Sequence, residues 1–585
     1  MLVLATALIL LLWLASAVVF VGVGMGWLRL VEPTPRLTYC FWAGLTAWVA
    51  FLEFWHLVLP MTGASLIVPI IAGVVGVWLG RDHLKDQIRG LLTMGRGPIL
   101  LYVAAVALLA VCATGPCRYG DTGTYGAPAV RWIQMYPAVP GLANVHGRLG
   151  FDSAVMLCVA ALGPGRYIDL GYHLFPGLIL SALAASVFPA WWKAWRKGRL
   201  AAWEWFMAML ALPVINWSLR GFLVGTVTDL PTSVAELLAI SIMIGRMTRA
   251  DPSLDDGSAP DPGANSPASA SRLPVVAALC AVAVAFKLSA AAIAGTTWAV
   301  GFFWICRAGD LVSSRRRTRD VLLYVLIPAI VLVPWLICHV ITSGYPFYPS
   351  TFAPFHVDWL VPPSVAHTDA DWIQQWARIP DVPPERTAGL AWVGVWFVRN
   401  AIHSATFDWP LIISASAVVF LIVNRLKGLG RRADSGPWAW MLAPALCGLG
   451  FWFWAAPDPR FGEGAIWSTT AILAVLALTR IDWNRHPPLP RTVAIALVVI
   501  ASLGPPPLLR HELLDVLRAP NTGLFPLPPY RGVTNFTRWG LCVYVSKTGD
   551  CWDGPLPNTP YFNPDLALRD PADMGKGFKV VQAAP

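Results

Sequence analysis

Side chains able to do acid–base chemistry gather in one stretch, 120–152, which directly follows a long apolar segment. Asp121 stands at its start. A carboxylate there is either a plain N-cap, favoured by the helix dipole, or a general base that takes a proton from a substrate. Residues 125–136 predict a short amphipathic helix at a membrane interface, with Trp132 and Tyr136 at the level of the lipid headgroups.

Three further polar residues, His146, Arg148 and Asp152, follow a Pro140-Gly141 turn in the same stretch. They have two interpretations. One is a salt-bridged loop that holds its own shape. The other is a group of side chains that together position a substrate, and the sequence leaves both open.

Two cations outside this stretch occupy positions that call for a partner or a function. Lys287 interrupts an apolar segment toward its predicted outer end, where it either extends to the lipid headgroups or faces the helix bundle. Arg460 lies in a polar turn, 457–462, between two late apolar segments. Its planar guanidinium suits phosphate oxygens, and the alternative is an interfacial arginine paired with Asp458 or Glu463.

Other ionisable residues near the ends of apolar segments are interpreted as interface residues: Glu53, His56, Arg220 and Asp229. The sequence contains no C-x-x-C or Cys/His metal spacing, so no metal site is predicted. It also lacks a P-loop and a Rossmann glycine fingerprint, which disfavours ATP-driven transport and predicts no nucleotide cofactor.

The elements that must position these residues are membrane helices. Hydrophobic residues make up 56% of the chain and charged residues only 13%, and the mean hydropathy is +0.58. Because the apolar runs are repeatedly near the roughly 20 residues that a helix needs to cross a bilayer, the sequence predicts an all-α polytopic membrane protein of about fourteen spans. These are 3–24, 38–59, 62–80, 98–115, 170–191, 200–218, 231–247, 273–291, 292–306, 321–342, 408–424, 437–455, 464–480 and 491–508.

The net charge of +10 indicates topology and not nucleic-acid binding, because the basic residues cluster in short connections between spans. The positive-inside rule assigns those connections to the cytoplasm. Both termini are then extracytoplasmic, and the first segment is retained as a helix because it lacks the features of a cleaved signal. The expected location is the bacterial inner membrane.

The predicted organisation has two membrane blocks. The first is 1–250, with an extracytoplasmic loop at 116–169, and the second is 272–508, with a loop at 343–407. A disordered cytoplasmic linker, 251–271, separates them because its Pro, Ser, Asp and Gly residues bury too little apolar surface to order it.

The remaining residues, 509–585, form a small, irregular extracytoplasmic tail. Cys542 and Cys551 lie together in this tail, where an oxidising compartment favours a disulfide.

The order Asp121, Tyr125, Ala129, Arg131 and a Pro140-Gly141 turn resembles the first outer loop of the GT-C superfamily of lipid-linked glycosyltransferases. The sequence PDPRFG is similar to a P-x-R-Y/F element that many of these enzymes carry in a late span. The run from Asp121 to Phe151 looks still more like a set of functionally uncharacterised bacterial multipass membrane proteins, over most of the chain.

The GT-C resemblance implies transfer of a sugar from a polyprenyl-phosphate donor to an extracytoplasmic acceptor. Asp121 is then the general base, and Arg460, with Lys287 if it faces the bundle, stabilises the departing phosphate. The expected substrate-binding residues are Arg460, Lys287, Tyr125, Arg131, His146, Arg148 and Asp152. The implied partners are membrane lipids, the lipid-linked sugar and the acceptor. The residues themselves require no metal, which departs from family members that bind a divalent ion through two nearby acidic residues, because Asp121 is followed by Thr122 and Gly123.

Two other functions stay open. One is a transporter or flippase of a lipid-linked or amphipathic substrate, and the other is a noncatalytic scaffold.

Overall fold

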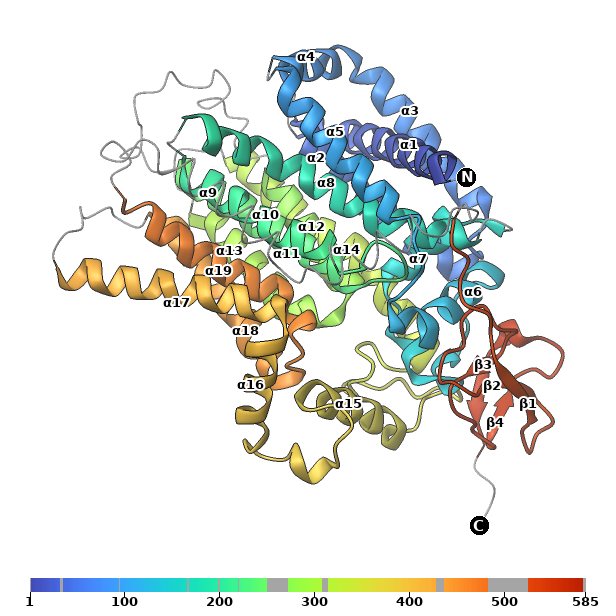
Figure 1. Cartoon of the computed structure of the whole chain (residues 1–585). Coiled ribbons are helices and arrows are strands. Elements are labelled where there is room, and N and C mark those ends of the chain that lie inside the picture. Colours follow the sequence, from blue (N-terminus) through green and yellow to red (C-terminus); the bar gives the residue numbers. More distant parts are fainter. Residues whose placement is uncertain are drawn as a thin grey trace.

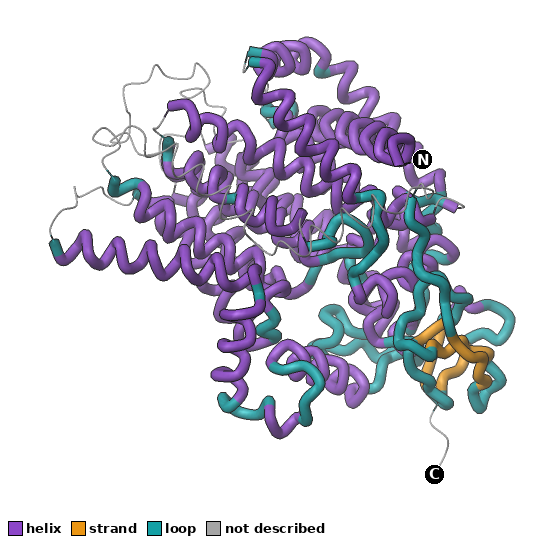
Figure 2. Tube along the Cα trace, viewed as in Figure 1, coloured by secondary structure: helices purple, strands orange, loops and turns teal. Residues whose placement is uncertain are grey.

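The computed structural model describes residues 2–31, 35–93, 95–165, 168–197, 200–218, 220–249, 272–307, 314–427, 436–481 and 524–581. Long helices fill most of the molecule and run side by side (Figure 1), and the strands gather near the C-terminus (Figure 2). The helices that form most of the bundle include α1 (Leu2–Leu28), α2 (Leu37–Val58), α8 (Ile168–Lys197), α11 (Asp229–Arg249), α13 (Ala291–Arg307), α14 (Ser314–Ser343), α17 (Ala405–Leu426), α18 (Leu442–Ala455) and α19 (Glu463–Leu478).

Within the described ranges, nine helices are long and apolar enough to cross a membrane. They coincide with nine of the predicted spans and confirm those as long apolar helices. A tenth comes from η1 and α3 (Gly63–Leu79) together with α4 (Arg81–Leu92), two segments bent by 77° at Gly80. The predicted span 491–508, the linker 251–271 and residues 509–523 of the tail lie outside the described residues.

Three predicted spans have a different structure. The segment 98–115 corresponds to α5 (Arg96–Cys112), a shorter apolar helix. The prediction of a single helix at 200–218 is wrong, because this segment forms two separate helices, α9 (Ala202–Met209) and α10 (Ala211–Ser218). The helix expected at 273–291 is α12 (Arg272–Phe286), which ends before Lys287.

Small residues bring several helices into close contact. Any Cβ on Gly24 would collide with the backbone of Cys40, and one on Gly44 with the backbone of Phe20. α1 and α2 therefore pack backbone to backbone, as small residues permit in membrane bundles. At the centre, α11 is almost entirely buried, and the alanine-rich α12 packs on it.

Shorter elements cover one end of the bundle. They are π-helix η2 (Thr122–Gly126), α6 (Ala127–Met135), η3 (Leu142–Asn144), η4 (Gly147–Phe151), α7 (Ala154–Leu162), η8 (Leu288–Ala290), α15 (Pro363–Arg378), η9 (Pro384–Arg386), α16 (Trp392–His403) and η11 (Pro459–Gly462). η10 (Pro437–Met441) instead begins the candidate span that continues as α18. The end of α2 lies at this covered end of the bundle, because the carbonyl of His56, late in α2, accepts the N–H of Ala138. α1 packs on α2 after a short connection, so the start of α1 lies at the same end. The basic helix α4 lies at the opposite end (Figure 1).

The described part of the tail, 524–581, forms a small module with two sheets. β1 (Gly532–Phe536) pairs antiparallel with β2 (Cys542–Ser546), which pairs parallel with β3 (Asn558–Thr559). β4 (Leu566–Leu568) pairs antiparallel with β5 (Phe578–Val580), and η12 (Met574–Lys576) precedes β5. The irregular tail predicted from sequence therefore has a small β core.

Two predictions about this region are wrong. Cys542 and Cys551 are free thiols: Cys542 lies in β2 opposite Phe536, whereas Cys551 is buried against Gly123, whose carbonyl accepts its N–H. Trp132 is not a headgroup anchor, because the module covers it and it is only 1% exposed.

Candidate functional site

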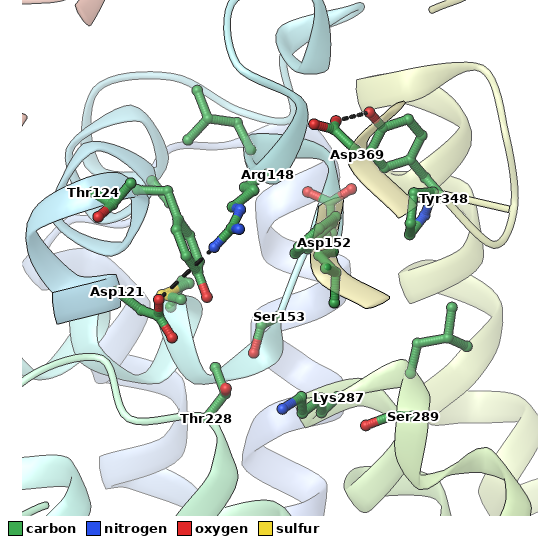
Figure 3. Close-up of a pocket in the computed structure, with 18 of the residues that line it drawn as sticks. Asp121, Thr124, Arg148, Asp152, Ser153, Thr228, Lys287, Ser289, Tyr348 and Asp369 are labelled. Atoms are coloured by element: carbon green, nitrogen blue, oxygen red, sulfur yellow. Dashed lines mark hydrogen bonds and ion pairs between the residues drawn. The ribbon is translucent and has the colours of Figure 1, made fainter. Parts of the chain in front are cut away.

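A cavity of about 1180 Å³ opens among the elements that cover this end of the bundle. Its walls come from segments far apart in the chain: the start of η2, the 146–153 loop, the α12–η8 break, α15, η11 and the loop 548–550 of the module. Figure 3 shows Asp121, Arg148, Asp152 and Lys287 directed into this space. The fold therefore brings most of the residues singled out by sequence to one cavity.

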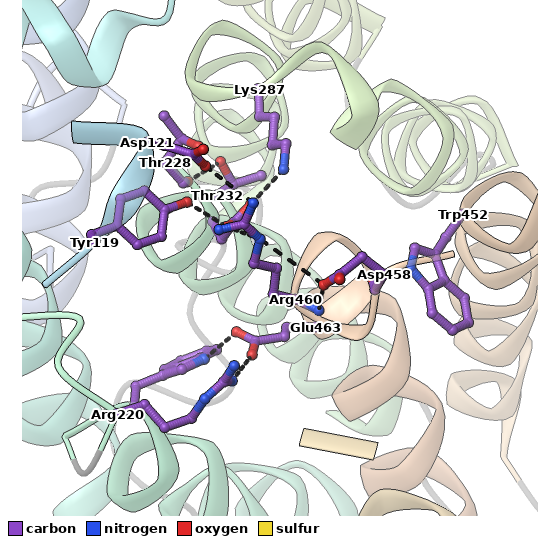
Figure 4. A network of polar contacts seen from close by, with 12 residues as sticks. Tyr119, Asp121, Arg220, Thr228, Thr232, Lys287, Trp452, Asp458, Arg460 and Glu463 are labelled. Atoms are coloured by element: carbon purple, nitrogen blue, oxygen red, sulfur yellow. Dashed lines mark hydrogen bonds and ion pairs between the residues drawn. The ribbon is translucent and has the colours of Figure 1, made fainter. Parts of the chain in front are cut away.

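Arg460 is the centre of an ionic network (Figure 4). It stands in η11, where Pro459 suits the first helical position and the Asp458 side chain accepts the Arg460 N–H at 3.0 Å. The guanidinium Nη2 lies 3.1 Å from Asp121 Oδ2, and Nε lies 3.9 Å from both Asp229 Oδ2 and Asp458 Oδ1. The alternative partner Glu463 instead pairs with Arg220.

Asp121 occupies the N-cap position of η2 but does not act as a cap. Its side chain makes no capping hydrogen bond to η2. It lies between two arginines, with Oδ1 3.8 Å from Arg148 Nη1 and Oδ2 against Arg460. The side chain is 17% exposed, which leaves it accessible from the cavity.

Lys287 faces the bundle and does not extend to the headgroups. It takes an extended conformation just after α12, and Nζ lies 2.5 Å from Asp229 Oδ1 and 3.9 Å from the centre of the Phe461 ring. Tyr119 donates its hydroxyl to the other oxygen of Asp229 at 2.7 Å. The buried Asp229 thus holds Lys287 and Arg460 together, although it does not itself line the cavity.

Arg148 and His146 pack against aromatic rings next to Asp121. The Arg148 guanidinium lies 4.5 Å from the Trp372 ring and 5.4 Å from the Tyr125 ring. The His146 ring meets Tyr561 of the module edge to face at 5.2 Å. Burial, helped by the positive charge of Arg148, lowers the pKa of His146 to about 3, so the imidazole is neutral.

Asp152 occupies another part of the cavity wall. Thr342 donates its hydroxyl to the carboxyl, and Trp335 donates its indole N–H to the backbone carbonyl at 3.0 Å. Burial raises the pKa of Asp152 to about 7 against the opposing hydrogen bonds. The interpretation of His146, Arg148 and Asp152 as one salt-bridged loop is wrong, since Arg148 pairs with Asp121.

Arg131 is the predicted substrate-binding residue that lies apart from the cavity. Its guanidinium pairs with Asp553 of the C-terminal module. The module is further attached by the N–H of Phe578, which donates to the Pro140 carbonyl at 2.9 Å. Arg131 thus fastens the module that completes the cavity.

Sequence reasoning missed several residues of this site. Asp229, Glu53 and His56 were interpreted as interface residues, but all three are buried and the last two line the cavity. Asp369 of α15, which accepts the Tyr348 hydroxyl at 2.7 Å, carried no signal beyond its place in an outer loop. Burial raises the pKa of Asp369.

The fold and site define a helical protein with nine candidate membrane spans in its described residues and a cavity of paired charges at one end. The chain belongs to a family described as "Domain of unknown function (DUF8201)", which it matches over residues 7–467. No curated protein and no solved structure matches it. The matched range includes Asp121, Lys287 and Arg460.

Proposed function

We propose that this chain is an inverting glycosyltransferase of the bacterial inner membrane that takes a sugar from a polyprenyl-phosphate donor. One observation carries the proposal: Arg460 and Arg148 converge on the carboxylate of Asp121 in a single cavity, and Asp229 joins Lys287 to Arg460 beside it. A phosphate needs cations, and an attacking hydroxyl needs a base. This arrangement offers both within one ionic network.

A membrane setting is supported by the nine long apolar helices and by the separation of charge along the bundle. α4 carries Arg81, Lys85 and Arg89 at one end, and the cavity is at the other. With the basic end in the cytoplasm, the cavity faces outward. Extracytoplasmic termini follow from the same orientation.

Part of the cavity wall is apolar and comes from α13 and α18. Ile293, Gly448 and Phe451 line it there, and Phe451 is 44% exposed. A prenyl chain suits such a wall because its burial is driven by apolar surface alone. The phosphate of the same donor then reaches the cations.

Group transfer follows from this arrangement. The acceptor hydroxyl oxygen attacks the anomeric carbon and forms the new C–O bond, while the bond from that carbon to the phosphate oxygen breaks. The electron pair leaves with the polyprenyl phosphate, and Arg460 and Lys287 stabilise its charge. Asp121 takes the hydroxyl proton. Since a bound phosphate competes for Arg460, donor binding releases Oδ2 of Asp121 from its ion pair with Arg460.

The test is transfer from a radiolabelled polyprenyl-phosphate sugar to membrane acceptors. Asp121→Asn keeps the shape but removes the base, and we expect a loss of about 100-fold or more in rate. Asp458→Asn is the matched control, since Asp458 also pairs with Arg460 but does not line the cavity. Equal activity of Asp121→Asn and the wild type rules out Asp121 as the general base.

Arg460→Ala tests the donor phosphate separately. We expect the apparent KM for the lipid donor to rise by about tenfold or more, because a charge-assisted contact is lost. Arg538→Ala, in an exposed pair with Asp565, is the control. An unchanged donor KM removes the assignment of Arg460.

A further inference from the structure

The cavity contains a second polar region that the proposed transfer does not use. Glu53 of α2 and Asp152, which follows η4, both line it. The two carboxyls are close enough to interact electrostatically. The thiols of Cys158 and Cys338 are the titratable groups that face them, and neither carries positive charge.

This carboxyl pair lacks a counter-ion in the described part of the chain. No salt bridge joins Glu53 or Asp152 to a cation, and Glu53 Oε1 is buried without any hydrogen-bond partner. One turn further along α2, His56 also lines the cavity, and its Nδ1 has no partner. These side chains are only 2% and 6% exposed.

Buried polar atoms of this kind normally have a partner, because a group taken out of water without a hydrogen bond destabilises the fold. The cavity is where a partner can enter. Within the searched and described residues, no group of three or more His, Cys, Asp or Glu side chains is suited to hold a metal ion. A ligand group that donates hydrogen bonds and carries positive charge would satisfy these acceptors.

The carboxyl pair is linked to the phosphate-binding cations through the backbone. Ser153 donates its hydroxyl to the Phe286 carbonyl at 2.6 Å, and these two residues directly adjoin Asp152 and Lys287. Figure 3 shows Ser153 between Asp152 and Lys287. A single ligand can thus present its phosphate to one group and another substituent to the other.

We propose that Glu53 and Asp152 bind the primary ammonium group of the substrate, so that the transferred sugar is an amino sugar. This inference rests on the proposed function and names its substrate class. An ammonium group donates three hydrogen bonds and supplies the positive counter-charge that the two carboxylates lack. Asp152, with its pKa raised to about 7, is poised to ionise when such a cation enters.

The experiment measures binding of prenyl-phosphate-linked sugars to the full-length protein in lipid nanodiscs. The ligands are farnesyl phosphate carrying glucosamine, 4-amino-4-deoxyglucose, glucose or N-acetylglucosamine. We expect at least one amino sugar to bind about tenfold tighter than glucose or N-acetylglucosamine. This ranking in the wild type needs no variant, so it does not depend on how a substitution folds.

The double variant Glu53→Gln/Asp152→Asn should lose that preference while affinity for the glucose ligand stays within about twofold. Glu204→Gln is the matched control, a buried carboxyl that pairs with Lys193 outside the cavity, and it should keep the preference. Equal binding of all four ligands overturns the ammonium site but leaves the donor proposal standing. Binding of none of them overturns both, and a preference that survives in the double variant overturns the assignment of these residues.

Discussion

Asp152 combines a constrained backbone with a buried carboxyl. Its φ of 39° lies in the left-handed region, where Asn and Asp are the residues best tolerated after glycine. Trp335 and Thr342 fix its two ends. The carboxyl is therefore held at the cavity wall in an environment that favours its neutral form.

Replacing Asp152 by Asn should stabilise the protein at alkaline pH. In the wild type the folded-state pKa, about 7, lies above the unfolded value of 3.8, so the folded state binds the extra proton between them. Stability from this group is complete below pH 3.8 and is lost as the pH rises to about 7. The asparagine variant lacks this loss. Since one pKa unit corresponds to about 1.4 kcal/mol and the two values lie about three units apart, its full advantage above pH 7 should be about 4 kcal/mol.

Thermal unfolding in detergent between pH 5 and pH 8 measures this effect. The Tm of Asp152→Asn relative to the wild type should increase as the pH is raised. Asp358→Asn is the control, because Arg569 holds the pKa of that exposed carboxyl below its usual range, and its titration ends below pH 5. A difference in Tm that is constant with pH for Asp152→Asn contradicts the assignment.

Sequence reasoning at this scale found residues but not their partners. Asp121, Lys287 and Arg460 stand out by type and position in a polar stretch or apolar segment. Asp229 starts an apolar helix and looks like a typical N-terminal acid. Its role depends on Lys287, 58 residues away, and only the tertiary fold brings the two together.

At the scale of elements, the C-terminal module completes the cavity because it is docked on α6. The Phe578 ring is fully buried and meets Trp132 edge to face at 5.6 Å. Tyr561 and Asp550 then contribute to the cavity wall. A module that detaches would remove this part of the site.

Phe578→Ala should loosen the module. Truncating a buried phenylalanine costs about 3–5 kcal/mol, which is large for a module of this size. Amide exchange across residues 524–581 should become faster, while exchange in the central helix α11 stays slow. Phe536→Ala in the same module is the control because that ring is 68% exposed. Similar exchange rates in both variants show that the module does not depend on this contact.

Single helices were predictable where one apolar run forms one helix, as in α1, α14 and α17. They were not predictable where a run is broken. The apolar run around Lys287 continues on both sides of this residue, yet α12 ends at Phe286 because the Lys287 side chain turns toward Asp229. Hydropathy reports burial and length but carries no information about such a break.

At the scale of the molecule, the charge pattern and the fold both separate a basic end of the bundle from the end that holds the cavity. The predicted count of about fourteen spans is reduced to nine long helices, or ten with the bent pair, within the described residues. The difference comes from broken or shorter apolar helices and from the undescribed segment 491–508. The separation of the basic connections from the cavity depends less on this count, because it follows from which helix ends lie together at each end of the bundle.

This separation predicts the orientation in the membrane. Glu385 of η9 lies among the elements at the cavity end, and Asp86 of α4 lies at the basic end. Both are exposed. The background protein carries serine in place of Cys306, Cys447 and Cys542, and its other seven thiols are buried. A single cysteine is then introduced at position 385 or at position 86.

Spheroplasts expressing Glu385→Cys or Asp86→Cys are then treated with a membrane-impermeant maleimide. We expect Glu385→Cys to react in intact spheroplasts and Asp86→Cys to react only after permeabilisation, because the basic end faces the cytoplasm. Permeabilised samples of both variants control for intrinsic reactivity, and the serine background controls for the native thiols. Labelling of Asp86→Cys in intact spheroplasts with protection of Glu385→Cys would reverse the orientation and turn the cavity toward the cytoplasm, where an extracytoplasmic acceptor could not reach Asp121.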